Sequence, residues 1–179
     1  MTKPECNYFS GTEGVDDFYG DAESVIASRV KDLDLTPHPV VQKQLSSKQL
    51  KVINRKIEAR VATKEEYKRF AWNKRFKKRR DKGVNNFWTE EQKRLEKGEK
   101  GTREWNNEQR QAIINGKKAK FDGTTLIGHH TYSTREYPHL ADKASVVYPA
   151  TSYEHLKGWH GGNYKRSLPG RRIRRIREF

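Results

Sequence analysis

The sequence predicts an α+β protein, and two features lead to that prediction. Apolar residues recur at steps of three and four at Leu50, Ile53 and Ile57, which is the spacing of an amphipathic helix. Much later, two β-leaning runs at residues 124–127 and 145–148 flank an irregular polar loop, and a stretch with helix-start residues follows them. Helices therefore come first along the chain, and a unit of strand, loop, strand and helix comes last.

The charge of the chain is its strongest compositional feature. The 179 residues carry a net charge of +15, and only 32% of them are hydrophobic. Residues 1–36 hold three basic and eight acidic side chains, so 35 basic against 15 acidic remain beyond them. Such a field attracts polyanions, with nucleic acid the first candidate; a basic protein that is merely soluble is the alternative. The thin apolar supply predicts one compact core with appendages, part of which we expect to order only in a complex.

Cysteine content and hydropathy exclude several kinds of protein. The single cysteine, Cys6, excludes an internal disulfide and a four-cysteine zinc site. No N-terminal stretch has the form of a signal peptide, and no run approaches the ~18 to 20 apolar residues of a membrane span. We therefore expect a soluble protein with no membrane partner, whose export, if any, uses a route that this chain does not encode.

Composition divides the chain into three parts. Residues 1–45 are predicted to form an acidic, irregular N-terminal arm with one short helix around 21–30. Residues 46–103 are predicted to form a basic helical extension, and residues 104–179 a core that ends in an arginine-rich tail. His38, between two prolines in the arm, is expected to be an ordinary surface histidine.

Helix-start signals recur in the extension. One of the serines at 46–47 can cap the first helix, and Thr63 starts a second helix that we expect to stop at Gly83. Thr89 and Asn106 each precede a glutamine at capping-box spacing, so each is expected to begin a further helix.

The second of these helices carries the densest positive charge. Residues 74–82 hold seven basic residues and one acidic residue, with Phe76 among them. Aromatic residues within a basic run suit a nucleic-acid surface, whereas a solvated helix with its aromatic residues in the core explains the pattern equally well. The residues predicted to contact nucleic acid here are Lys77, Lys78 and Arg79.

Two adjacent histidines end the first predicted strand. Successive side chains of an extended backbone point to opposite faces, so His129 and His130 are not expected to share one task. One can face a metal while the other faces a water or substrate. His155 and His160, on the helix that follows the second strand, are natural further ligands if that helix packs on the strands. Neutral imidazole suits Zn²⁺ or Ni²⁺, while Mg²⁺ needs more oxygen around it.

These segments resemble the HNH or His-Me finger nucleases, specifically the bacterial polymorphic-toxin nucleases with a Gly-His-His signature. The matching text is GHH at 128–130, YPHLA at 137–141, YPAT at 148–151 and EHLKGWHGGN at 154–163, within a resemblance that covers about residues 104–166. The GHH motif alone is a weak signal, whereas its combination with the later histidine pair and Gly-Gly-Asn is much more specific. The resemblance implies a ββα-metal core behind a helical, basic N-terminal extension.

The resemblance also implies roles for the histidines. His129 would ligate a divalent metal (Mg²⁺, Zn²⁺, Ni²⁺ or Mn²⁺), His130 would be the general base that activates a water, and His155 and His160 would complete the metal site. One departure matters, since the two helix histidines are five residues apart here and four apart in the related colicin-type DNases. Either the helix unwinds near its glycine at 158, or only one of the two ligates and Asn163 contributes.

The function implied is a metal-dependent endonuclease with little sequence preference, with DNA as the expected substrate. It would be the toxic C-terminal domain of a secreted bacterial effector, delivered by a specialised secretion system into the cytoplasm of a target cell. An acidic cognate immunity protein would neutralise it, and no small-molecule cofactor is expected. Two alternatives stay open: an RNase toxin, and a non-catalytic nucleic-acid-binding module whose histidines hold a structural zinc.

Basic residues near the predicted site are candidate phosphate contacts. Those outside the helical extension are Arg135, Lys157, Lys165, Arg171 and Arg172. For the first three the alternative is a solvated surface charge, and for the tail arginines it is a disordered basic segment. His139 in the loop and Trp159 on the helix are expected to be structural.

Overall fold

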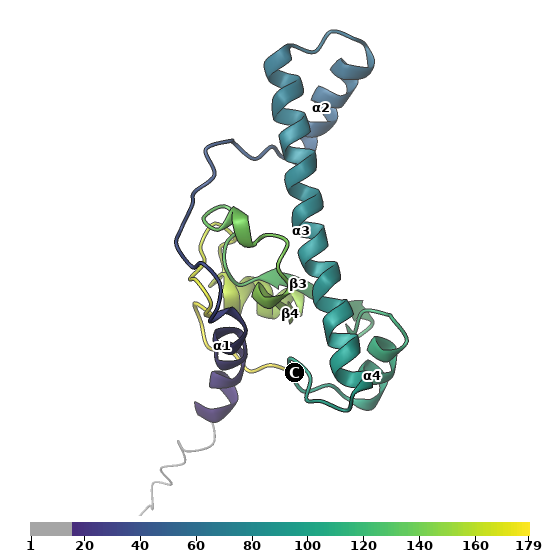
Figure 1. Ribbon diagram of the computed structural model, residues 1–179, viewed down its shortest axis with the longest axis vertical. Helices are drawn as coiled ribbons and strands as arrows, with labels where there is room; N and C mark the ends of the chain where they lie inside the picture. Colours follow the sequence, from purple (N-terminus) through teal and green to yellow (C-terminus); the bar gives the residue numbers. More distant parts are fainter. Residues whose placement is uncertain (1–15) are drawn as a thin grey trace, which may run out of the picture.

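The computed structural model of the protein describes residues 16–179, with side chains from residue 22 onward (Figure 1). The α-helices are α1 (Asp16–Val30), α2 (Ser47–Glu58), α3 (Lys64–Glu96) and α4 (Asn107–Ile114). The strands are β1 (Lys120–Phe121), β2 (Thr124–Thr125), β3 (Ile127–His130) and β4 (Val147–Ala150). Shorter helices are η1 (Pro138–Leu140), η2 (Ala144–Val146) and η3 (Glu154–Trp159). The expected α+β class is confirmed, while Cys6 lies outside the described residues.

The long helix α3 organises the rest of the molecule. Figure 1 shows α2 folded back on one end of α3, α4 at the other end, and the β3–β4 pair beside its lower half. The predicted helix starts are confirmed, since Ser46 and Thr63 each accept a hydrogen bond from the backbone N–H three residues on, in a capping box. None of the helices in the described part of the chain is both long and apolar enough to cross a membrane.

The prediction that the helix starting at Thr63, α3, stops at Gly83 and that another begins at Thr89 is wrong. The helix is continuous, and the Thr89 hydroxyl donates to the carbonyl oxygen of Asn85 at 3.1 Å instead of capping a new start. Gly83 is there for packing, because a Cβ at that position would collide with the carbonyl oxygen of Ala141. A glycine inside a helix costs about 1 kcal/mol relative to alanine, and here it lets α3 approach the loop beside the histidines.

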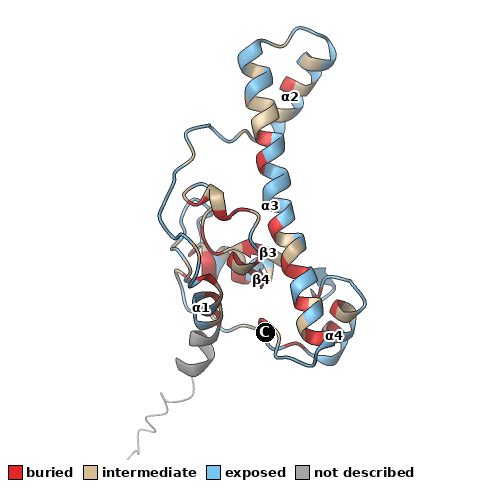
Figure 2. Ribbon diagram, in the orientation of Figure 1, coloured by how far each residue is buried: buried red, intermediate tan, exposed pale blue. Residues whose placement is uncertain are grey.

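The core has two parts, one on each side of the β3–β4 pair. In the first, the α1 residues Ala22, Ile26 and Val30 pack with Tyr148 and Trp159. The three residues of α1 are four apart and so lie on one helical face. The helix of the N-terminal arm, α1, is therefore packed on the core (Figure 2), while residues 31–45 of the arm are irregular.

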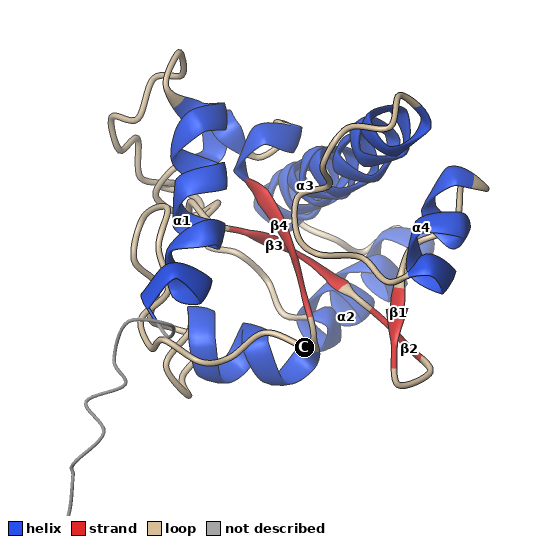
Figure 3. Ribbon diagram, turned by 90° about the horizontal axis from the view of Figure 1, so that it is seen from below, coloured by secondary structure: helices blue, strands red, loops and turns tan. Residues whose placement is uncertain are grey.

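The second part of the core joins α3 to the strands. Phe87 and Leu95 of α3 pack with Ile113 of α4, with Leu126 and with Val147 of β4. Figure 3, seen from below, shows β3 and β4 crossing between α1 on one side and α3 on the other. The division of the chain at residue 103 stays a prediction, and the packing extends across it.

The arginine-rich C-terminal segment folds back onto the molecule. Gly170 N–H donates to Thr131 O at 2.9 Å, and Ile173 N–H donates to Gly158 O at 3.0 Å. The ring of Phe179 stacks on Phe121 with centroids 4.2 Å apart. These contacts place the C-terminal segment against η3, against β1 and against the residue that follows β3, so the described tail is ordered.

Candidate metal centre and general base

The β3–β4 pairing separates the two adjacent histidines. Antiparallel register sets His129 opposite Tyr148 and His130 opposite Val147. Because neighbouring residues of a strand point to opposite faces, the two rings enter different surroundings. The side of His129 is closed, with 5% of that residue exposed, while His130 is half-buried.

Three histidines meet on the His129 side of the strand. The His129 ring lies 4.9 Å from the ring of His155 and 5.1 Å from that of His160, measured between centroids. One ligand nitrogen from each of the three lies within 4.8 Å of the others. We call this set the strand–helix cluster. Trp159 is buried against it, with its ring centroid 4.8 Å from that of His129, so its expected core position is confirmed.

A π-helix accommodates the five-residue step between His155 and His160. Residues of η3 are wound so that His160 N–H donates to His155 O at 3.1 Å, an i→i+5 hydrogen bond. In that winding, residues five apart become neighbours on one face, and the two Nε2 atoms are 3.2 Å apart. The helix therefore widens and does not unwind. π-Helical segments of this kind recur at functional sites.

Hydrogen bonding prepares His160 to act as a ligand. Its Nδ1 lies 2.6 Å from the carbonyl oxygen of Arg166. A carbonyl only accepts, so Nδ1 carries the proton and Nε2 of the neutral ring keeps its lone pair. Metal-ligating histidines usually donate their other nitrogen to an oxygen in this way. Two donors bound to one tetrahedral zinc would be about 3.3 Å apart, close to the observed Nε2 separation.

Burial favours the neutral forms of His129 and His155. Burial and, to a smaller extent, the neighbouring His160 together lower the pKa of His155 to about 4. Burial also lowers the pKa of His129 well below its ordinary value, with smaller contributions in the same direction from the surrounding histidines. Neutral imidazole is the form that binds metal, so this environment favours ligation at pH 7.

His130 is oriented by a backbone carbonyl. Its Nε2 lies 2.8 Å from Ala141 O, so Nε2 donates and Nδ1 of the neutral ring is the free acceptor. Burial lowers the pKa of His130; the bond to Ala141 opposes that shift, and the nearby Arg80 adds to it. Ala141 lies eleven residues from His130, and no local sequence signal identifies it as this acceptor.

The His130 side opens into a cavity of about 370 Å³ between the strand and the helical extension. His130 and Gly128 line it from β3, and Lys77 and Arg80 line it from α3. Phe76 is buried among these residues. The basic helix and the histidine predicted to be the general base therefore share one cavity.

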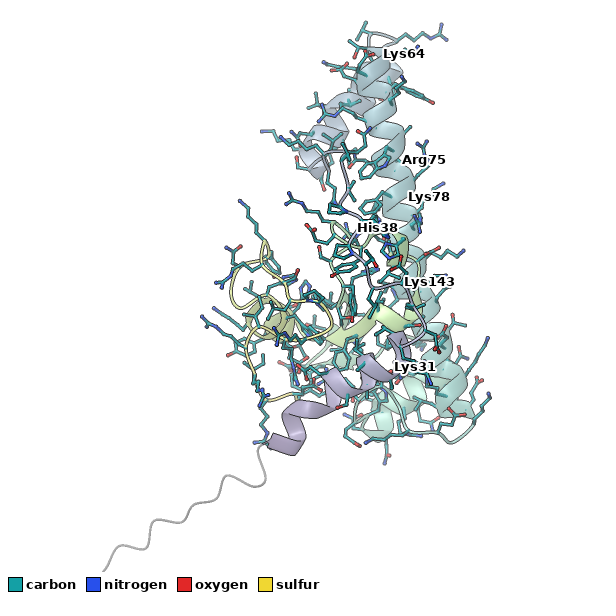
Figure 4. All side chains as sticks on the ribbon, turned by 60° about the vertical axis from the view of Figure 1, so that its left-hand side comes forward. Lys31, His38, Lys64, Arg75, Lys78 and Lys143 are labelled. Atoms are coloured by element: carbon teal, nitrogen blue, oxygen red, sulfur yellow. The ribbon has the colours of Figure 1, made fainter. Side chains whose placement is uncertain are left out.

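The structure scatters the other predicted nucleic-acid contacts over the surface. Lys78 projects from α3 into solvent (Figure 4), while Arg79 is held 3.3 Å from Asp142. Lys77 forms an ion pair with Asp81 at 2.5 Å. The exposed residues from later segments are Arg135, Lys157, Lys165 and Arg171. All of these stay predictions.

Arg172 is a correction. The sequence predicts that it binds nucleic acid, but its side chain is 2% exposed and its Nη2 lies 2.7 Å from a carboxylate oxygen of Glu23. A second ion pair joins Nη1 to Glu178 at 3.2 Å. Two carboxylates occupy the guanidinium, which ties the C-terminal segment to α1 and leaves no route to a phosphate.

Asn163, the predicted alternative ligand, lies in the exposed turn after η3. Its Oδ1 accepts from Lys165 N–H at 3.0 Å, and its backbone N–H donates to His160 O at 3.0 Å. Both bonds shape the turn that brings Arg166 O to His160. A ligand role for Asn163 stays a prediction.

Sequence reasoning missed the ion pair that anchors η3. Arg103 is 3% exposed and binds Glu154 through two bonds of 2.9 and 3.0 Å. Burial alone would raise the pKa of Glu154, but Arg103 outweighs it and the net shift is downward. One signal was present, since Thr151 and Glu154 form a capping box. The partner, 51 residues away in the chain, carried no local signal.

Two antiparallel strands and a helix converging on histidines define a class, the ββα-metal or His-Me finger arrangement. Residues 71–151 match a family described as GHH signature containing HNH/Endo VII superfamily nuclease toxin. The matched segment includes the adjacent histidines His129 and His130 and ends before η3. Both the resemblance and the ββα-metal fold expected from the sequence are confirmed.

Curated proteins with similar segments are teneurins. The chain is 36% identical over 69 residues to Teneurin-3 of Danio rerio, and 33% identical over 70 residues to Teneurin-4 of Mus musculus and to Teneurin-1 of Gallus gallus. Each match covers 38% of this chain and 2% of the relative. The chain thus spans a very small part of the length of these relatives.

Proposed function

We propose that the protein is a metal-dependent endonuclease. The observation that carries the proposal is the division between the adjacent histidines: His129 joins a three-imidazole cluster, and His130 is held by a carbonyl with one nitrogen free. The match of residues 71–151 to a family of nuclease toxins supports phosphodiester hydrolysis as the reaction.

The residues present fit a divalent metal. His129, His155 and His160 would hold it, and when bound it would neutralise the charge that develops on the scissile phosphate and on the leaving oxygen. Three imidazoles suit Zn²⁺, Ni²⁺ and similar ions, and Mg²⁺ or Mn²⁺ would take more oxygen from water and phosphate. A closed structural zinc site uses four ligands, whereas the described residues supply three histidines here, which favours the catalytic alternative.

His130 would act as the general base. With Nε2–H bound to Ala141 O, its Nδ1 accepts the proton of the attacking water. The water oxygen then bonds to phosphorus as the bond to the leaving oxygen breaks. The Ala141 carbonyl keeps the ring in place and stabilises the imidazolium that forms. A neutral His130 at pH 7 is ready for this step.

Nucleic acid would approach His130 along the basic helix. Lys77 and Arg80 line the cavity that His130 opens into, and Lys78 extends the positive surface along α3. A cavity of about 370 Å³ admits a nucleotide-sized group, and contacts from basic side chains to phosphates carry no direct sequence information, which supports cleavage with little sequence preference. DNA is the proposed substrate.

The biological setting proposed is that of a toxin. The description of the matched family as nuclease toxins supports a bacterial protein delivered into a target cell, and the net charge of +15 supports neutralisation by an acidic immunity protein. Co-expression in bacteria tests both points. Expression of the chain alone should kill the bacteria, and co-expression of an acidic protein encoded next to it should restore their growth.

A plasmid assay tests the enzymatic proposal. Wild type should nick and linearise plasmid DNA with Mg²⁺, Mn²⁺, Zn²⁺ or Ni²⁺ and should stop with EDTA. His130→Ala should stay folded, keep its metal and lose about 10²- to 10⁴-fold in rate. A structural RNA assayed in parallel decides between DNase and RNase. Intact plasmid and intact RNA with every metal would contradict the nuclease proposal.

A further inference from the structure

A second group of metal-binding side chains lies away from the strand–helix cluster. The connector between α1 and α2, residues 31–46, runs against the β3–β4 loop, residues 131–146 (Figure 4). His38 N–H donates to Glu136 O at 2.8 Å, and Val40 N–H donates to Arg135 O at 2.9 Å. Two segments about a hundred residues apart in sequence are thus held edge to edge by their backbones.

This pairing brings three ligand-type side chains together. One ligand atom each from Asp34, His38 and His139 lies within 4.8 Å of the others. The Asp34 carboxylate oxygen is 3.1 Å from His38 Nε2, and the two histidine rings are 4.7 Å apart between centroids. We call this set the connector cluster. Its 3.1 Å spacing is close to the ~3.3 Å expected for two donors on one tetrahedral ion.

His139 supplies the observation that separates this group from an ordinary surface ion pair. Its Nε2 lies 2.8 Å from the backbone carbonyl oxygen of Asp34, which fixes the proton on Nε2. Its Nδ1 is buried and has no hydrogen-bond partner among the described residues. A buried, unpartnered acceptor is costly and rare. A cation held through this nitrogen would satisfy it, while the bond to Asp34 O would orient the ring as in known metal sites.

We propose that Asp34, His38 and His139 form a second metal site that takes a Zn²⁺-class transition-metal ion. Two imidazoles with one carboxylate form a typical ligand set for such ions, whereas Mg²⁺ and Ca²⁺ prefer a set made of oxygen ligands. The side chains of Asp34 and His38 are more than half exposed, so an ion can enter from solvent and keep water in its remaining positions. The role of this site is mechanical, because it joins the connector to the loop.

The loop that this ion would hold also orients the proposed general base. His139 lies two residues before Ala141, whose carbonyl accepts from His130. The backbone carbonyl of His139 also lies 3.5 Å from Arg79 of α3. Occupancy of the connector cluster would therefore steady the loop from the side opposite α3. His38 and His139, expected from the sequence to be an ordinary surface histidine and a structural one, become ligands of one ion.

Zinc stoichiometry of the purified full chain tests the proposal. We expect about two Zn²⁺ per chain for wild type and about one for Asp34→Asn, His38→Gln and His139→Gln. Asp32→Asn, which removes the same charge from the same connector outside the cluster, should keep about two. His155→Gln should lose the other ion and keep the connector ion. Far-UV circular dichroism identifies any variant that fails to fold.

Wild-type crystals soaked in Zn²⁺ give a readout that needs no variant. Anomalous scattering at the zinc edge should show a peak between Asp34, His38 and His139, separate from the peak among the other three histidines. An empty position there would overturn the proposal. So would one zinc per wild-type chain that His155→Gln loses, or two zincs retained by both His38→Gln and His139→Gln.

Discussion

The two histidine clusters of this protein differ in how they are built. The strand–helix cluster consists of imidazoles alone, on β3 and a π-helix, with His129 buried. The connector cluster includes a carboxylate and lies at the surface, with the side chain of Asp34 58% exposed. Three neutral imidazoles do not reduce the positive charge of a bound ion, and a set of three ligands leaves a coordination position open for a phosphate. A carboxylate in solvent partly neutralises its ion, which suits a structural role.

Loss of the Arg103–Glu154 pair should have the largest effect, because the strand–helix cluster depends on it. Arg103→Gln leaves Glu154 buried without its cation, which should cost about 3 to 5 kcal/mol of unfolding free energy. Urea denaturation measures this loss, with Lys117→Gln on the surface as the matched control. The affinity of the strand–helix cluster should fall while the connector cluster keeps its ion. Equal stability of the two variants would show that the pair does not anchor η3.

Removal of one ligand from the strand–helix cluster comes next. His160→Gln should lower its metal affinity by more than about 100-fold, since even the outer partners of ligands contribute about 10- to 100-fold. Cleavage should fall with it. Competition with a zinc chelator measures the affinity, and His130→Ala, on the other face of the strand, should bind metal as wild type does. Unchanged metal affinity of the His160→Gln variant would show that His160 is not a ligand.

Acid should separate the clusters in the metal-free protein. The folded pKa of His155, about 4, is below its ordinary value of 6.5, so only the unfolded chain takes up this proton in between. The contribution of the neutral His155 to the free energy of unfolding is fully present above pH 6.5 and is lost as the pH falls toward 4. Hydrogen bonds to Thr36 and His38 lower the pKa of Asp34, so its contribution is lost only below about pH 4. We would measure the free energy of unfolding with urea, in EDTA, from pH 7 to pH 3. Between pH 6.5 and 4 it should fall less steeply for His155→Gln than for wild type.

The smallest effect should come from the basic helix, which serves neither cluster as a ligand. Lys77→Glu with Lys78→Glu should weaken DNA binding and flatten its salt dependence, by about one unit of log–log slope for each phosphate that is no longer neutralised. Metal affinity should not change. Lys117→Glu with Lys118→Glu is the control of equal charge change. If both double variants had the same slope of DNA affinity against salt concentration, α3 would be an ordinary solvated helix and not a DNA-binding surface.

Local sequence signals predicted much of the scaffold. Capping boxes at Ser46, Thr63 and Asn106 begin helices where expected, because a cap is a contact between residues three apart. The same locality misled at Thr89, where the pattern is present but the helix is already formed. Stop signals were less reliable. Gly83 lies inside α3, where the missing Cβ leaves room for the carbonyl oxygen of Ala141 and does not end the helix.

The candidate site was predictable in its members and not in its geometry. The alternation of side chains along a strand is enough to separate His129 from His130. The spacing of His155 and His160 argued against a shared face on an α-helix, and only the π-helical winding of η3 brings them together. Arg172 shows the reverse error, since an arginine-rich segment indicates a surface and the fold buries this arginine between two carboxylates.

By itself, the sequence determined the charge, the α+β order, the helix starts and the opposed directions of the two adjacent histidines. Each of these follows from composition or from contacts within about four residues, which the backbone imposes wherever the chain lies. Tertiary structure alone decided the carbonyl of Ala141 on His130, the pairing of Arg103 with Glu154, and the meeting of His38 with His139. Those partners are distant in sequence, and packing selects them because burial penalises every polar group left without one.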